Sequence, residues 1–216
     1  SSQLNFIAAG VPMQAQLHGL QQQGHYQVSL QAQGEQPLEQ LLTLVSPSLA
    51  KLGQGPVPYL WDLQISLPPT GFQYSSTMNL DLAAAELALP EPFGKQKTDG
   101  VGLQIDTKGD DIGSRIELRY GDQLAFSGHV NQATGAIDQA LLSLGQSDAQ
   151  LKDGFYIDAG LSSAELNDWL VLLVEQIRQW PSSDEQPALF PALSGVTARI
   201  ERLHLFDDVN FHQAQL

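Results

Sequence analysis

The 216-residue sequence contains no cysteine. It therefore has no disulfide framework, no thiolate metal site and no cysteine nucleophile. Basic residues are scarce as well, because ten lysines and arginines stand against 24 aspartates and glutamates and leave a formal net charge of −14. A chain this acidic does not neutralise nucleic-acid phosphates or anionic headgroups by its overall charge, which excludes nucleic acid as a partner.

Long apolar runs are missing too. No run of about 18 apolar residues marks a membrane-spanning helix, and the first residues lack the features of a secretion signal. No linker rich in Gly, Ser or charge divides the chain, so we expect one domain over residues 1–216. The last residues, Phe211 to Leu216, have the pattern of a strand that simply stops. Complete proteins normally cover such strand edges, so we expect the domain to be a fragment of a much longer protein.

Short stretches in which apolar and polar residues alternate are abundant, and each predicts a strand with one apolar face. The residues predicted to share the apolar side of three successive strands are Val101, Leu103 and Ile105; Ile116, Leu118 and Tyr120; and Leu124, Phe126, Gly128 and Val130. Pairs such as Gly109-Asp110 and Gly121-Asp122 lie at the joints, where a chain reversal needs them. We therefore predict an antiparallel meander.

Alternation predicts strands along most of the chain. The expected ranges are 25–33, 58–67, 72–83, 101–108, 114–120, 123–131, 136–144, 154–160, 196–205 and 209 onward. A leucine-rich stretch at helical spacing, Leu38 to Val45, lies between Pro37 and Pro47. The clearest helix is predicted over 163–180, because Ser162 and Glu165 match a capping box and apolar residues recur every three or four positions. Whether this helix lines, plugs or flanks the sheet stays open.

Acidic residues invite a hydrolase interpretation, with Asp110-Asp111 or Asp207-Asp208 as paired carboxylates. Adjacent strand residues point to opposite faces, so neither pair converges on one substrate. Asp106, Asp110 and Asp111 miss the spacing of an EF-hand, and five isolated histidines miss that of a zinc site. No serine nucleophile elbow or dinucleotide-binding glycine pattern occurs. We predict no catalytic residue, no metal and no cofactor.

One Pro-punctuated segment, Leu89-Pro90-Glu91-Pro92-Phe93-Gly94-Lys95, follows the predicted strand Asn79-Leu80-Asp81-Leu82. It resembles the stretch of LP-x-P-φ-x-K type in bacterial YhdP proteins of the AsmA-like group. A second match is Asp158-Ala159-Gly160-Leu161-Ser162 leading to Asp168-Trp169-Leu170, which is similar to that family's glycine-then-acidic-Trp segment. With the order of the strands, the resemblance covers most of the chain.

The resemblance implies a place in the cell envelope of Gram-negative bacteria. Proteins of this family are anchored in the inner membrane, span the periplasm and curl their antiparallel strands into a long apolar groove. They are associated with phospholipid transport between the two membranes, alongside TamB-like relatives. The implied partners are phospholipid acyl chains, the inner and outer membranes reached by the full-length protein, and other envelope proteins. The family's N-terminal membrane anchor is not in this sequence.

Pattern and resemblance together predict a mainly β protein with minor α, in which an extended, curved antiparallel sheet forms an open groove beside one prominent amphipathic helix. We expect a segment of a lipid conduit rather than an enzyme. The residues expected to line the groove are Leu103, Ile105, Ile116, Leu118, Leu124, Phe126 and Val130. The alternative is a β-sandwich with a filled core that binds or scaffolds other envelope proteins, and an enzyme ranks third.

Overall fold

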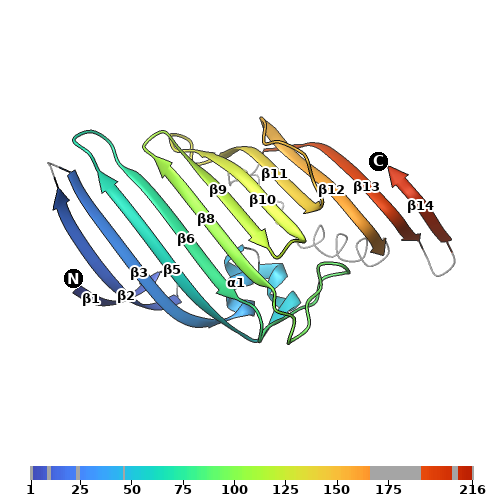
Figure 1. Ribbon diagram of the computed structural model, residues 1–216, viewed down its shortest axis with the longest axis horizontal. Helices are drawn as coiled ribbons and strands as arrows, with labels where there is room; N and C mark the ends of the chain where they lie inside the picture. The colour runs from blue at the N-terminus through green and yellow to red at the C-terminus, as the bar shows by residue number, and fades with distance from the viewer. Residues whose placement is uncertain are drawn as a thin grey trace.

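One twelve-stranded sheet organises the computed structural model, which describes residues 2–8, 11–22, 25–45, 47–165, 191–205 and 209–215. The strands lie side by side in the order of the chain (Figure 1). Their bounds are β1 Ser2–Ala8, β2 Val11–Gln22, β3 His25–Pro37, β5 Pro56–Leu67, β6 Gln73–Asp81, β8 Gly102–Asp110, β9 Gly113–Tyr120, β10 Leu124–Asn131, β11 Ile137–Gly145, β12 Gly154–Glu165, β13 Leu193–Leu205 and β14 Val209–Gln215. β4 (Gly53–Gln54) and β7 (Glu86–Leu87) form a separate pair. The prediction of a mainly β, open sheet is confirmed.

The predicted meander is confirmed from β1 to β11, where each strand pairs antiparallel with the next strand of the sheet. It is wrong at β12, which pairs parallel with both β11 and β13. A parallel neighbour requires the chain to return to the same end of the sheet before the next strand begins. The sheet is therefore mixed rather than wholly antiparallel.

Every strand that alternation predicts is present, with ends that differ by a few residues. The pattern did not predict β1 and β2, which add two strands at one edge of the sheet. Along β2, small residues such as Ala15 and Gly19 alternate with polar ones such as glutamine, so the two faces of the strand differ little in hydrophobicity. A strand of this kind is recognised from its pairing with β3 rather than from its own pattern.

The start of the helix predicted over 163–180 is wrong. Ser163 pairs with Arg202 and Ala164 with Leu203, so residues up to Glu165 continue strand β12. Hydrogen bonding to β13 overrides the local capping signal of Ser162 and Glu165. The remainder of that helix, from residue 166, lies outside the described residues. No helix in the described part of the chain is long and apolar enough to cross a membrane.

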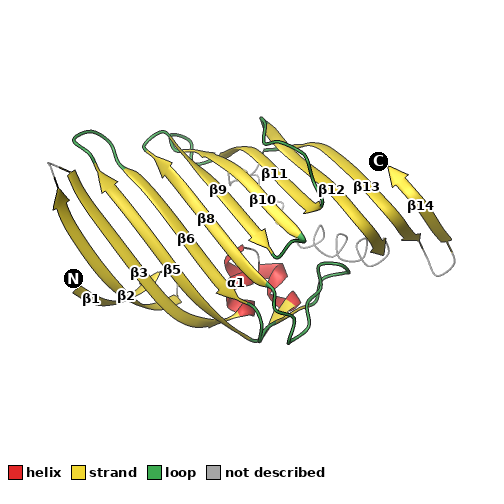
Figure 2. Ribbon diagram, viewed as in Figure 1, coloured by secondary structure: helices red, strands yellow, loops and turns green. Residues whose placement is uncertain are grey.

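One end of the sheet is covered on one face by a small unit that we call the plug. The plug consists of α1 (Leu38–Val45), the 3₁₀ helix η1 (Pro47–Leu52), the β4–β7 pair and the loop 82–101. The predicted helix between Pro37 and Pro47 is thereby confirmed. Figure 2 shows both helical turns gathered beside the ends of β5, β6 and β8.

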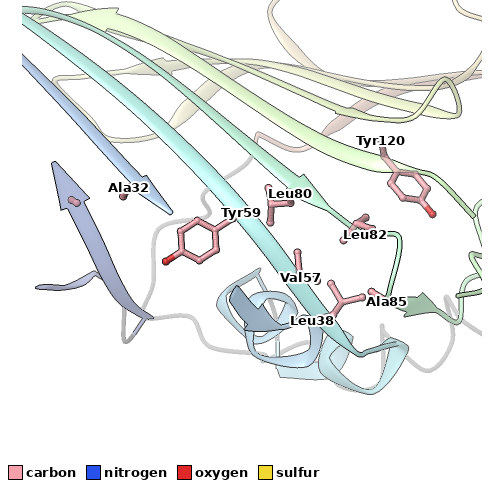
Figure 3. Packing of buried hydrophobic residues seen from close by; sticks show 9 residues of the cluster. Ala32, Leu38, Val57, Tyr59, Leu80, Leu82, Ala85 and Tyr120 are labelled. Atoms are coloured by element: carbon pink, nitrogen blue, oxygen red, sulfur yellow. The ribbon is translucent and has the colours of Figure 1, made fainter. Parts of the chain in front are cut away.

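The best-buried side chains lie between the plug and the sheet. Leu38 of α1 faces Val57 on β5, and Leu80, Leu82 and Tyr120 close the cluster (Figure 3). Val57 has no exposed surface, and Phe93 from the loop is 1% exposed. Burying a side chain of this size contributes roughly 1.5–3 kcal/mol. The largest fully buried side chains therefore lie at one end of the sheet, while residues such as Ala140 and Ala159 are buried on β11 and β12.

Lys95, the last residue of the Pro-punctuated segment, is 2% exposed. Its ammonium donates hydrogen bonds of 2.8 Å to the backbone carbonyls of Ala85 and Gln96. Leu87 and Lys95 also exchange two backbone hydrogen bonds of 2.9 Å. Lysine is rarely buried without partners, and here the two carbonyls tie both sides of the loop 82–101 together.

Candidate functional site

The strand register brings all seven predicted groove residues to one face of the sheet. Ile105, Leu118 and Phe126 lie directly opposite one another on β8, β9 and β10. Directly paired residues point to the same side of a sheet. The same rule places the others on this face through the rows Leu103–Tyr120–Leu124, Thr107–Ile116–Gly128 and Gly109–Ser114–Val130. We call this side the apolar face and the opposite side the outer face.

The apolar face extends well beyond the predicted residues. The row through Leu118, which we call the central row, runs through Ala15, Ala32, Trp61, Met78, Ile105, Leu118, Phe126, Leu142, Ile157 and Val196. The sequence predicts the strands that hold Trp61 and Met78 but does not assign their faces. Alternation within those strands was the signal that could have found them.

From Trp61 to Ile157 the side chains of the central row are half-buried, whereas Ala15 and Ala32 belong to the buried core cluster and Val196 is exposed. The ring of Phe126 lies over Gly128, where a Cβ would stand 2.9 Å from the ring's Cζ. The glycine therefore makes room for a neighbouring aromatic ring, and the row keeps an even apolar surface.

Polar side chains on the apolar face hydrogen-bond to one another. The Trp61 indole Nε1 donates to Ser76 Oγ at 2.7 Å, and the Tyr74 hydroxyl donates to Ser114 Oγ at 2.7 Å. A buried donor left without a partner costs about 1–3 kcal/mol. These pairs remove that cost before anything covers the face, so the polar atoms do not oppose contact with an apolar ligand.

The outer face of the same strands is polar. Thr77 and Gln104 donate to the two carboxylate oxygens of Asp106, each at 2.7 Å. Glu117 accepts from Arg115 at 2.8 Å and from Arg119 at 3.3 Å, and the side chains of both arginines are about half exposed. Exposed ion pairs of this kind contribute roughly 0–1 kcal/mol each. Their main effect here is to keep the outer face in water.

Where the strands end beside the plug, a hollow of about 860 Å³ opens next to Pro92. Leu161 and Ile200 line it together with Arg199. The Arg199 Nη2 atom lies 3.7 Å from Asp158 Oδ2, a buried oxygen that has no hydrogen-bond partner. Charged and apolar groups are mixed here, in contrast to the central row.

Carboxylates in the described residues do not form a metal-binding group. Asp110 accepts backbone N–H bonds from Ile112 at 2.9 Å and Gly113 at 3.2 Å, which lower the pKa of its carboxyl. It therefore shapes the β8–β9 turn. Asp207 and Asp208 lie outside the described residues. No group of three or more His, Asp or Glu side chains that could hold a metal occurs in the part of the chain that the structure describes.

Two tyrosines mark the closed end of the apolar face. Burial raises the pKa of Tyr59, and burial together with the negative charge of Asp99 raises the pKa of Tyr120. The Tyr120 hydroxyl donates to the Phe93 carbonyl at 3.2 Å. Both groups therefore stay neutral at physiological pH, and Tyr120 fastens the loop 82–101 to the sheet.

A protein-family model described as YhdP protein matches residues 1–216, which is the whole chain. Neither the curated proteins nor the solved structures contain a significant match. The match confirms the resemblance found in the Pro-punctuated segment and in the order of the strands.

Proposed function

Because the chain belongs to the YhdP family of the bacterial envelope, we propose that it is one segment of a conduit that carries phospholipids across the periplasm, between the inner and outer membranes. Acyl chains lie on the apolar face while headgroups remain in water. Movement is passive, because neighbouring positions along the face offer acyl chains a similar apolar surface. The parent protein supplies the remaining length and the attachment to the inner membrane.

The observation that carries this proposal is the central row. It crosses ten strands, from β2 to β13, without a charged side chain. Strands lie about 4.8 Å apart, so the row extends for roughly 43 Å. An extended row of partly exposed apolar side chains is the kind of surface that marks an interaction site.

The paired polar atoms give a second reason. An acyl chain has no group with which to satisfy a hydrogen-bond donor. Because Trp61 and Tyr74 already donate to Ser76 and Ser114, covering the face with hydrocarbon leaves these two donors satisfied.

The alternative, a filled β-sandwich that scaffolds other proteins, needs a second sheet packed about 10 Å from this face. Among the described residues the other sheet is the β4–β7 pair, which has two residues in each strand and belongs to the plug. No observation favours this second function. An enzyme is disfavoured as well, because the family is one of envelope transport.

Photocrosslinking in cells tests the proposal. A photoreactive amino acid replaces either Leu118 on the apolar face or its neighbour Arg119, whose side chain is 58% exposed on the outer face, in the full-length protein. We expect phospholipid to be captured at Leu118 and not at Arg119. Equal capture at both positions, or none at Leu118 when the protein is made at its normal level, contradicts the conduit.

A further inference from the structure

The apolar face has two different ends. At the plug, Tyr59 and Leu80 are each 6% exposed and Tyr120 is 5% exposed. At the opposite end of β5, Leu67 is 40% exposed, and its cross-strand partner Tyr26 on β3 is 52% exposed. At β3 and β5 the face is therefore open at the end away from the plug. We call the open end the rim.

Aromatic rings and hydroxyl groups gather at the rim. Phe72 stacks on Tyr74, with ring centroids 6.3 Å apart and planes 20° apart. The Tyr74 hydroxyl reaches Ser114 on the next hairpin, and Tyr26 adds a second phenol. Tyrosine combines an apolar ring with a polar tip, and for that reason it is enriched at the level of lipid headgroups in membrane proteins.

The distance between rim and plug matches the length of a lipid tail. On β8, Gly109 lies at the rim and Leu103 beside the plug, six residues apart. At about 3.4 Å per residue this separation is roughly 20 Å. Each leaflet contributes half of a hydrocarbon core that is about 30 Å thick, or about 15 Å. One acyl chain therefore fits along a strand between rim and plug.

Basic residues lie one position inside the rim on the outer face. Lys108, Arg115 and His129 are directly opposite one another on β8, β9 and β10, an arrangement of like charges that destabilises a sheet. Arg115 contacts Glu117 and His129 contacts Asp138 at 2.7 Å. Within the described residues Lys108 has no ion-pair partner.

A hollow of about 510 Å³ opens beside these residues and is lined by Lys108, Arg115 and His129. Asp110 also lines the hollow, but the N–H groups of its own turn engage its carboxylate. These cations lie on the outer face, so the polar side-chain groups of the rim on the apolar face itself are hydroxyls, including those of Tyr74 and Ser114.

We propose that lipids lie on the apolar face in one orientation, with acyl chains directed toward the plug and the phosphate of the headgroup at the Tyr26–Tyr74 rim. This inference rests on the proposed function and adds to it the side from which headgroups face water. At the plug, Phe93, Val57 and Leu82 are buried and occupy the end of the apolar face. A lipid that turned round would press its phosphate against this core.

The test identifies which part of a captured lipid touches each position. Photoreactive residues replace Ile65 at the rim, Leu103 beside the plug, Leu118 between them, and Gln64 on the outer face as the control, in the full-length protein. Cells are grown with ³²P-phosphate and ¹⁴C-acetate, and the lipid esters of each adduct are hydrolysed with mild alkali. An adduct at the glycerophosphate keeps ³²P, whereas an adduct on an acyl chain keeps ¹⁴C alone.

We expect ³²P to be retained at Ile65 and lost at Leu103, where ¹⁴C remains. The reverse pattern, the same pattern at both positions, or lipid at Leu118 with none at Ile65 overturns the orientation and leaves the conduit standing. Absence of lipid from Ile65, Leu103 and Leu118 alike overturns the conduit and the orientation together.

Discussion

Leucines beside the plug and leucines in the central row lie on the same face of the same sheet but have different surroundings. Leu80 is 6% exposed beneath the plug, whereas Leu118 is half-buried. Both occupy the apolar positions of an alternating strand. The difference lies in what covers them rather than in the residue or the strand. One alternating pattern thus builds a core beneath the plug and a partly exposed apolar surface elsewhere on the same face.

The largest expected effect separates these two regions by stability. Phe93→Ala empties a site in the core and is expected to lower the free energy of unfolding by about 3–5 kcal/mol. Leu118→Ala is expected to lower it by about 1–2 kcal/mol, because its side chain is already partly exposed. Denaturant titration of the two variants measures both losses. Equal losses would mean that the central row is core as well.

A smaller effect is expected inside the plug. Lys95→Met keeps the length of the side chain but leaves the Ala85 and Gln96 carbonyls without their donor, at a cost of about 1–3 kcal/mol. The control is Lys97→Met. It removes the exposed ion pair in which Lys97 Nζ lies 3.5 Å from Glu86 Oε1, and it is expected to change the free energy of unfolding by less than about 0.5 kcal/mol. Thermal unfolding of both variants compares them. A neutral Lys95→Met would show that the loop does not depend on this ammonium.

The smallest effect concerns alkaline pH. Tyr120 has a raised pKa in the folded protein, so above the unfolded value near 10 the unfolded chain releases its proton first. Stability present below pH 10 is therefore lost as the pH rises through the folded pKa. Tyr120→Phe is expected to weaken this loss, measured as unfolding midpoints between pH 8 and pH 11. An unchanged pH profile would mean that Tyr120 does not contribute to it.

The positions of most strands could be predicted because alternation is a local property of the chain. The groove residues followed for the same reason, since Leu103, Leu118 and Phe126 needed only a shared register to meet. Strand direction could not be predicted in this way, because a parallel strand has the same alternation as an antiparallel one. The parallel pairs of β12 are therefore visible in the structure and not in the pattern.

Two other features depend on contacts between distant residues. Ser162 and Glu165 satisfy a local helix signal, yet pairing with β13 draws residues 163–165 into a strand. Lys95 belongs to the Pro-punctuated segment, but nothing in the sequence indicates that its ammonium is buried. Only the carbonyls of Ala85 and Gln96, brought near by the fold, explain its position.

The in-register rows of the apolar face also determine how its shape repeats. Because paired residues align from β2 to β13, ridges and furrows on this face recur with the spacing between strands, about 4.8 Å. In the proposed conduit, an acyl chain that lies along a strand would rest in one furrow at a time. Movement of the acyl chain from one strand to the next would then take place in equal steps of about 4.8 Å. The free-energy barrier of each step would depend on the side chains of the two neighbouring strands.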